Sequence, residues 1–213
     1  EAGVSPHAVS DVYDLAANAA GAAAWAKRNE INAQAPVLNL VARLLAVQTE
    51  ERNWRIGAKG EEMVGRESAK LGDAWRVLHA VPLGNRGRDI DHLLIGPPGV
   101  FTVNTKRRPL AKVWVGDRTV RVNGHRTDYL PKSRDERDRS ATLLTKACGF
   151  DVPVRSALVF VGLSDFTVKT PPDDVIVTTC RQLVKRLRSE PTILTSDHIE
   201  HLYAHARRSV TWD

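Results

Sequence analysis

Two neighbouring apolar stretches of this chain carry side chains that could do chemistry. Asp89 and Asp91 stand at the start of one stretch, and Asn104 and Lys106 stand at the end of the next. Carboxylate and amide oxygens bind hard divalent cations, and a lysine ammonium stabilises negative charge on a phosphoryl group. Strand propensity alone requires none of these side chains. The pattern therefore predicts a cation and phosphate site of the kind that a metal-dependent phosphodiesterase uses.

The register of the hairpin between these stretches decides whether the side chains meet. Residues 96–99 read Gly-Pro-Pro-Gly, and a four-residue turn there pairs Ile95 with Val100. Counting outward along an antiparallel hairpin then sets Asp91 opposite Asn104. Directly opposed residues have Cβ atoms about 4.5–5.5 Å apart. The sequence therefore predicts that this carboxylate and this amide share one small volume.

Lys106 falls on the same face as Asp91 and Asn104, because side chains alternate faces along a strand. The same register sets Asp89 opposite Lys106. That pair could equally be an exposed cross-strand ion pair, worth under about 1 kcal/mol, and Asp91 could be a solvated strand-end residue. A carboxylate from another element would favour the metal site over these alternatives.

Glu61 is the candidate for that carboxylate. A helix predicted over residues 57–71 places Glu61 on one face with Val64 and Leu71. Carboxylates seldom lie on an inward-facing stripe unless they are paired or bound to a metal. Glu62 stays an alternative, because helical periodicity does not separate neighbours whose directions differ by about 100°.

The wider pattern of apolar and turn residues predicts a mixed α/β domain, with a central mixed sheet flanked by helices. The expected elements are a helix over 57–71, strands over 75–81, 89–95 and 100–106, a smaller hairpin of 112–115 and 119–122, a helix opened by the capping-box sequence Ser133–Glu136, strands over 157–161 and 175–179, and helices over 182–188 and 197–208.

The residues before this domain read as a helical extension. An amphipathic helix is indicated by one apolar stripe, formed by Val37, Leu40, Val41, Leu44 and Leu45. We therefore expect an extension over 1–53 and a main domain over 54–213. The stripe must pack against something, and it would cover the flank of the domain or join two copies in a homodimer.

Composition places the chain among globular proteins. Its 213 residues are 42% hydrophobic and 26% charged, and no segment approaches the roughly 18 uninterrupted apolar residues of a membrane helix. Cys148 and Cys180 are far apart and lack the spacing of metal ligands, which suggests a reducing compartment. The sequence predicts a cytoplasmic protein without a membrane segment in this chain.

Charge points to a polyanionic partner. The chain has 31 Lys and Arg against 25 Asp and Glu, and its pI is about 9.6. Trp114 and Tyr129 could stack on unpaired bases or pack the hairpin onto the core. Basic residues that surround the proposed site in sequence are expected to contact phosphates, and these are Arg86, Arg88, Arg107, Arg108, Lys132, Arg134, Arg137 and Arg139.

Other chemistry is less well supported by the sequence. His198, His201 and His205 could hold Zn²⁺ or Ni²⁺ from one helix face, although such a row is more often a solvated surface. His92 should point away from Asp91, to the opposite face of the sheet, as a packed residue. The chain has no Gly-Lys-Ser/Thr phosphate loop, which argues against an ATP-driven motor.

Three segments together resemble a known family. They are Gly57–Glu62, reading GAKGEE, Ile90–Pro97, reading IDHLLIGP, and Gly99–Lys106, reading GVFTVNTK. In combination they resemble the nuclease-related (NERD) domain, a branch of the PD-(D/E)xK restriction-endonuclease-like superfamily, over about residues 54 to 165. The resemblance implies a core in which a helix precedes a three-stranded meander. It also implies hydrolysis of phosphodiester bonds with Mg²⁺ or Mn²⁺.

The resemblance also implies roles for individual residues. Glu61 and Asp91 match the acidic metal-binding positions, and Lys106 matches the catalytic lysine that positions or helps deprotonate water. Thr105 would offer its backbone carbonyl to the metal. Asn104 stands where an acidic residue is usual, and its amide oxygen can bind a metal but brings no charge.

Three functions follow in order of preference. The first is a metal-dependent nuclease, for which DNA is preferred to RNA as the expected substrate although the sequence does not decide between them. The second is a nucleic-acid-binding module that keeps the nuclease fold but has lost catalysis because of Asn104. The third is an assembly or regulatory domain that uses the N-terminal helices for dimerisation.

Overall fold

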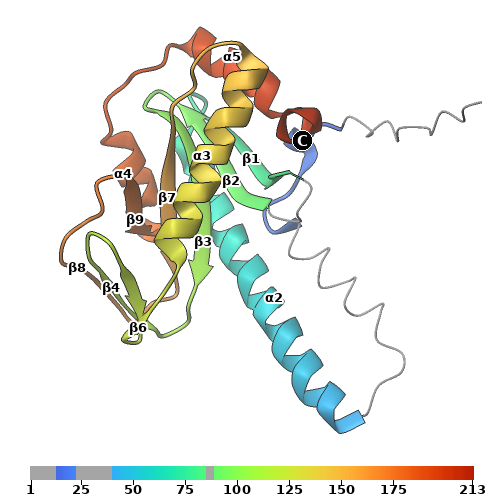
Figure 1. Ribbon diagram of the computed structural model, residues 1–213, viewed down its shortest axis with the longest axis vertical. Helices are drawn as coiled ribbons and strands as arrows, with labels where there is room; N and C mark the ends of the chain where they lie inside the picture. Colours follow the sequence, from blue (N-terminus) through green and yellow to red (C-terminus); the bar gives the residue numbers. More distant parts are fainter. Residues whose placement is uncertain (1–12, 23–39, 85–88) are drawn as a thin grey trace, which may run out of the picture.

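The structure is a computed structural model that describes residues 13–22, 40–84 and 89–213. It confirms the mixed α/β class (Figure 1). The helices are α2 (Leu40–Ser68), α3 (Tyr129–Cys148), α4 (Leu183–Arg188) and α5 (Ser196–Ala206). The strands are β1 (Arg76–Pro82), β2 (Asp89–Gly96), β3 (Gly99–Arg107), β4 (Lys112–Val115), β5 (Val120–Val122), β6 (His125–Arg126), β7 (Val154–Val161), β8 (Asp165–Val168) and β9 (Val175–Thr179).

The main sheet has the strand order β1-β2-β3-β7-β9. Its first three strands form an antiparallel meander, and β3, β7 and β9 run parallel. Ile95 pairs with Val100, which confirms the predicted register of the β2–β3 hairpin. Gly96 and Gly99 close the turn around the two prolines, and Gly99 has a φ of 122° that suits glycine.

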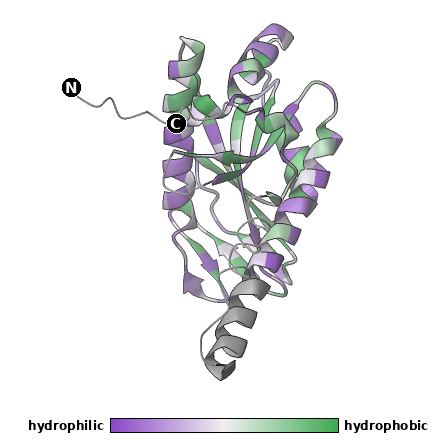
Figure 2. Cartoon of the chain, turned by 90° about the vertical axis from the view of Figure 1, so that its right-hand side faces the viewer, coloured by the Kyte–Doolittle hydropathy of each residue, from purple (hydrophilic) through white to green (hydrophobic). Residues whose placement is uncertain are grey.

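Helices cover both faces of this sheet, so its strands are apolar on both sides (Figures 1 and 2). On one face, Val64 of α2 and Leu183 of α4 pack with Phe101. On the other face, Leu144 of α3 and Leu202 of α5 pack with neighbouring sheet residues. None of the helices in the described ranges has the length and apolar character needed to cross a bilayer.

A second sheet, with the order β6-β5-β4-β8, packs beside the first. Its inner face places Val113, Val115 and Val120 against Leu130 and Phe160. The β4–β5 hairpin is the one predicted from sequence, whereas β6 and the parallel partner β8 were not predicted. This sheet lies beside the end of β3 that carries the candidate site (Figure 1).

Two helix starts differ from the expected ones. The predicted helix over 57–71 is the end of the longer α2, so the boundary predicted between residues 53 and 54 lies inside one continuous helix. The side chains of the stripe that begins at Val37 lie outside the described residues, and the homodimer stays a prediction. The described segment 13–22 packs on the domain, with Leu15 in the main core beside Trp212.

The predicted capping box of α3 was wrong. The helix begins at Tyr129 after Asp128, so Ser133 and Glu136 lie inside it. Leu130 is buried against Phe160, which favours a helix that starts one turn earlier. Pro131 fits the first turn, where its missing N–H interrupts no intrahelical hydrogen bond. A Ser-x-x-Glu sequence can therefore occur within a helix as well as at its start.

Candidate active site

A cleft of about 480 Å³ opens beside the end of β3, between the middle of α2 and the turn after β5. Its walls bring together segments that are distant in sequence. Among the lining residues are Trp54, Ile56, Glu61, Asp91, Thr105, Lys106, Arg107, Arg108, Val122 and Asn123. Two predicted carboxylates and the predicted lysine therefore share one cavity.

The end of the β2–β3 hairpin is tied together by hydrogen bonds. The backbone N–H of Thr105 donates to Oδ2 of Asp91 over 2.5 Å. The Lys106 ammonium donates to Oδ1 of Asn104. The last ladder pair joins His92 to Val103, so Asp91 and Asn104 stand one step beyond it. Asp91 therefore binds the backbone of β3 while Asn104 orients the lysine.

Glu136 of α3 is a member of this cluster that the sequence did not identify. The Asn104 amide nitrogen donates to both Glu136 carboxylate oxygens, over 3.0 and 2.8 Å. An amide that faces a carboxylate must present its N–H₂ group, which leaves its oxygen for Lys106. The one signal for Glu136 was the missing acidic residue at position 104, since it implied a carboxylate elsewhere.

The carboxyl groups of this cluster resist ionisation. Burial raises the pKa of Glu61 to about 8, and repulsion by Asp91 acts in the same direction while Lys106 opposes it. Burial also raises the pKa values of Asp91 and Glu136, again opposed by Lys106. Once ionised, three desolvated acids with one shared ammonium would leave unbalanced negative charge, so a bound cation would favour their ionised forms.

A distorted position in β1 lies opposite Asp91. His79 pairs with His92, and Val81 pairs with Ile90. The residues between these two pairs, one on each strand, are not paired in the ladder. On β1 that residue is Ala80, whose φ of 48° is unusual for a residue with a side chain. The Asn18 amide donates to the carbonyls of residues 79 and 80, each over 3.2 Å, and holds this conformation.

His92 lies on the opposite side of the strand from Asp91, as predicted. It is fully buried, and its Nδ1 lies 2.7 Å from Nδ1 of His79. Burial lowers the pKa of His92 to about 3, with a further contribution from His79. His92 is therefore a neutral packed residue under ordinary conditions and not a part of the cleft.

The side chains of α2 distinguish Glu61 from its neighbour. Glu61 lines the cleft with Asp91, whereas Glu62 lies 3.7 Å from Arg66 on the same helix. Gly60 allows this approach, because a Cβ there would lie 2.8 Å from Cβ of Arg107. The glycine thus sets how closely α2 can bring Glu61 to β3.

Gly60→Ala is expected to slow any reaction at this cleft by about 10–10²-fold, since small misplacements of catalytic groups can have effects of that size. The added methyl would press against the end of β3 and move Glu61 outward. Gly57→Ala is the matched control, because Gly57 also lines the cleft but a Cβ there meets nothing within 4 Å. Cleavage rates of both variants test this, and equal rates would show that the close approach is unimportant.

Only some of the predicted phosphate-contacting residues lie at the cleft in the structure. Arg107 and Arg108 line the cleft, and Arg108 donates to the Tyr129 hydroxyl over 2.6 and 3.0 Å. The Tyr129 ring also lies against Lys106, with 5.6 Å from the ammonium to the ring centre, and against Phe160. Tyr129 therefore supports the cleft and does not offer a free stacking surface.

The basic residues of α3 have partners within the fold. Lys132 lies 2.7 Å from Asp128, and Arg139 donates to the carbonyl of residue 83. Arg134 and Arg137 both bind Asp174, over 2.7 and 3.1 Å. Arg86 and Arg88 lie outside the described residues. The structure therefore brings Arg107 and Arg108 to the cleft but gives the charges of α3 other contacts.

The alternative histidine site is not assembled. Rings of His201 and His205 lie 4.9 Å apart. Across the three described ranges, however, no three histidine, cysteine or acidic side chains already converge on one point that could hold a metal. The three histidines of α5 therefore do not form a three-ligand metal site.

The mixed sheet and its acidic hairpin end define a nuclease-like α/β domain. Residues 56–161 match the model of a family described as the nuclease-related domain. Residues 56–161 therefore form a nuclease-related domain, and through it belong to the PD-(D/E)xK restriction-endonuclease-like superfamily, as the sequence motifs indicated. No curated protein and no solved structure matches the chain.

Proposed function

We propose that this chain is a metal-dependent nuclease that hydrolyses phosphodiester bonds of DNA. The observation that carries this proposal is the cleft in which Glu61 and Asp91 lie with Lys106, within a nuclease-related domain. A half-buried acid pair beside one ammonium is suited to holding a cation against a phosphate group. The basic residues Arg107 and Arg108 would contact the nucleic-acid backbone at the same cleft.

The donor set fits Mg²⁺ or Mn²⁺. Glu61, Asp91 and the Thr105 carbonyl would supply oxygen ligands only, as hard cations prefer, and the Asn104 oxygen would join them by giving up its contact with Lys106. Mg²⁺ often uses one or two protein carboxylates, with water and substrate phosphate completing its shell, so a preformed three-acid centre is not required. When bound, the metal lowers the pKa of a coordinated water and offsets charge on the phosphate.

Lys106 would act on the attacking water and the reacting phosphate. Its ammonium is held by the Asn104 oxygen, and the Tyr129 ring lies beneath it. This arrangement fixes the charge in place before the reaction, which is the condition for strong stabilisation of a transition state. The ammonium would then orient the attacking water and stabilise the phosphoryl oxygens by donating hydrogen bonds.

Asn104 and Glu136 would together replace the acidic residue that the family resemblance leads us to expect at position 104. The amide is neutral, and the carboxylate bound to it supplies one negative charge next to the site. The pair therefore carries the same formal charge as a single acid at position 104. Glu136 would also hold the amide so that its oxygen faces the lysine.

Stability without metal is expected to fall as pH rises from about 4.5 to about 8. The pKa of Glu61 is raised from its ordinary 4.5 to about 8 in the folded chain, so folding favours the protonated acid. The resulting stabilisation is complete below the unfolded pKa and is lost as the folded acid ionises. Melting temperatures in EDTA should decline over this range, and Mg²⁺ should raise them more at alkaline pH.

Glu61→Gln is the control for this pH dependence, because it removes the titrating proton while keeping the side-chain shape. Its melting temperature in EDTA should vary less between mildly acidic and mildly alkaline buffer. An unchanged pH dependence in Glu61→Gln would assign the effect to another group.

Cleavage assays test the proposed function directly. Single-stranded, linear duplex and supercoiled DNA would be incubated with the chain in EDTA, Mg²⁺ or Mn²⁺. We expect cleavage that needs a divalent ion, leaves a 5′ phosphate and is absent in an identically prepared Asp91→Ala protein. Cleavage that persists in Asp91→Ala would indicate a contaminating nuclease.

A second candidate is a binding module without catalysis, and the neutral amide at Asn104 is the observation that favours it. Such a module would bind DNA with an ordinary salt dependence and without a divalent requirement. Folded protein that binds but does not cleave under any metal condition would support this function instead.

We also propose a reducing, cytoplasmic location. Cys148 and Cys180 are both free thiols in the structure. Free cysteines are usual where disulfides do not persist. Localisation of the tagged full-length protein by fluorescence microscopy tests this.

A further inference from the structure

The outer face of the second sheet carries an exposed tryptophan beside an arginine. Trp114 on β4 is directly opposite Arg121 on β5, and Arg121 is opposite Arg126 on β6. On its other side Trp114 is paired with Thr167 of β8. Because directly paired residues share a face, these four side chains form one row across the sheet, which we call the Trp114 row.

Trp114 does not belong to the core under this sheet. Its neighbours Val113 and Val115 point inward and are buried, whereas Trp114 is 39% exposed. Its ring leans over Gly116, where an added Cβ would lie 2.7 Å from Cη2. The indole is thus supported by the backbone on one side and accessible from the other, as a base-stacking platform requires.

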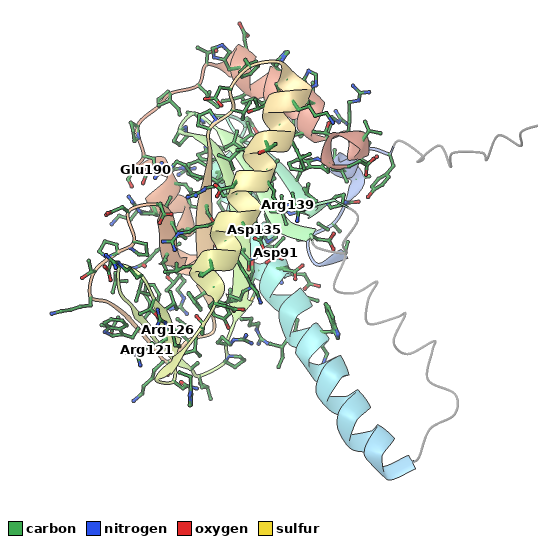
Figure 3. The ribbon with its side chains drawn as sticks, in the orientation of Figure 1. Asp91, Arg121, Arg126, Asp135, Arg139 and Glu190 are labelled. Atoms are coloured by element: carbon green, nitrogen blue, oxygen red, sulfur yellow. The ribbon has the colours of Figure 1, made fainter. Side chains whose placement is uncertain are left out.

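The Trp114 row is also electropositive. Arg121 and Arg126 are both exposed and lie close together on the second sheet (Figure 3). Arg121 uses one nitrogen to donate to the carbonyl of Gly124 over 3.2 Å, which leaves other donors of its guanidinium for a ligand. The nearby Asp117 is paired with Arg118 over 3.5 Å. The surface therefore complements a polyanion.

The row and the cleft share one hairpin. Val122 and Asn123, which follow Arg121, line the cleft. Asn123 is fixed in the turn, because its side-chain oxygen accepts from the backbone N–H of Lys112 over 2.9 Å. The β4–β5 hairpin therefore links the wall of the cleft to the Trp114 row.

We propose that the Trp114 row binds a single-stranded segment of the nucleic acid, with an unpaired base stacked on Trp114 and phosphates contacted by Arg121 and Arg126. This inference rests on the proposed nuclease function and deepens it by naming the substrate class. Bases in a duplex are stacked on one another, so a free indole face favours unpaired bases. Phosphate contacts alone would not require the aromatic residue.

Binding in EDTA tests this inference without catalysis. Fluorescence anisotropy would follow a labelled oligothymidine and a labelled duplex with wild type, Trp114→Ala, Trp114→Phe and an Arg121→Ala/Arg126→Ala double variant. Phe150→Ala is the matched control, since Phe150 is another exposed aromatic residue but packs beside His201 of α5. All variants would first be compared by thermal melting.

Trp114→Ala should weaken oligothymidine binding about 5- to 150-fold, which corresponds to about 1–3 kcal/mol per stacked base. Trp114→Phe should retain most of the affinity, and Phe150→Ala should change nothing. The double arginine variant should weaken binding and lower its salt dependence. Duplex binding should change little in Trp114→Ala. Equal losses for duplex and single strand, or no loss in Trp114→Ala, would overturn the inference.

These outcomes are separable from those of the proposed function. Selective loss of single-strand binding in Trp114→Ala supports the inference even if the wild-type chain cleaves nothing. Conversely, metal-dependent cleavage of a single-stranded overhang that is unchanged in Trp114→Ala would support the nuclease and overturn the Trp114 row.

Discussion

Lys106→Ala is expected to slow metal-dependent DNA cleavage by about 10²–10³-fold, the typical effect of removing one preorganised electrostatic contact. The ammonium is held by Asn104 and lies against the Tyr129 ring, so its charge is fixed in place before the reaction and alanine removes it. The loss should appear mainly in kcat, because the charge acts on the transition state rather than on DNA affinity. Single-turnover cleavage with saturating protein would measure it.

Removing Lys106 should also change the apo protein in a defined way. The ammonium lowers the pKa values of Glu61, Asp91 and Glu136 against the effect of burial, so its loss should raise all three further. Lys146→Ala is the control, because Lys146 is an exposed lysine in the last turn of α3. A similar loss of rate in both variants, or a wild-type rate in Lys106→Ala, would remove Lys106 from the reaction.

The β2–β3 hairpin is the part of the site that could be predicted in detail from sequence. Its register depends on a Gly-Pro-Pro-Gly turn and on strand alternation, which are both local properties. The observed pairing of Ile95 with Val100 follows this register. The register up to His92 and Val103 was therefore accessible without knowing the rest of the fold, whereas the hydrogen bond from Thr105 to Asp91 was not predicted.

Glu136 was not accessible in this way. It is 32 residues from Asn104, and their contact depends on how α3 crosses the sheet. The Ser133–Glu136 sequence matches a capping box, so it predicted a helix start there and gave no sign of a contact between Glu136 and Asn104. Figure 3 shows Asp91 close to α3, a proximity that only the three-dimensional packing creates. The distorted Ala80 is equally a product of packing, because Asn18 of a distant segment holds it.

Charge alone also could not show which cations are free. Arg134 and Arg137 resemble a solvated basic surface in sequence, yet Asp174 near the start of β9 binds both of them. Arg121 and Arg126 come together through β6, a strand of two residues that carries almost no sequence signal. Because Asp174 binds these two arginines of α3, the arginines proposed to contact a polyanion lie at the cleft and in the Trp114 row.

Glu136→Gln is expected to lower metal affinity or activity about 10–100-fold, as found when partners that orient metal-site groups are removed. The substitution keeps the size of the side chain but removes the negative charge next to Asn104. Cleavage rates across a range of Mg²⁺ concentrations would measure the effect. Asp138→Asn is the control on α3, since Asp138 is exposed and pairs with Arg137.

The double variant Asn104→Asp/Glu136→Gln should recover most of that loss. It moves the carboxylate from α3 to β3, and the introduced glutamine amide can donate to the introduced aspartate, so charge and hydrogen bond are both kept. Asn104→Asp alone places two carboxylates at a contact of 2.8–3.0 Å, and repulsion should lower its melting temperature in EDTA. A structural role of Glu136 in α3 would leave the double variant as impaired as Glu136→Gln. Recovery would instead show that the site needs one negative charge at this position, whichever of the two elements supplies it.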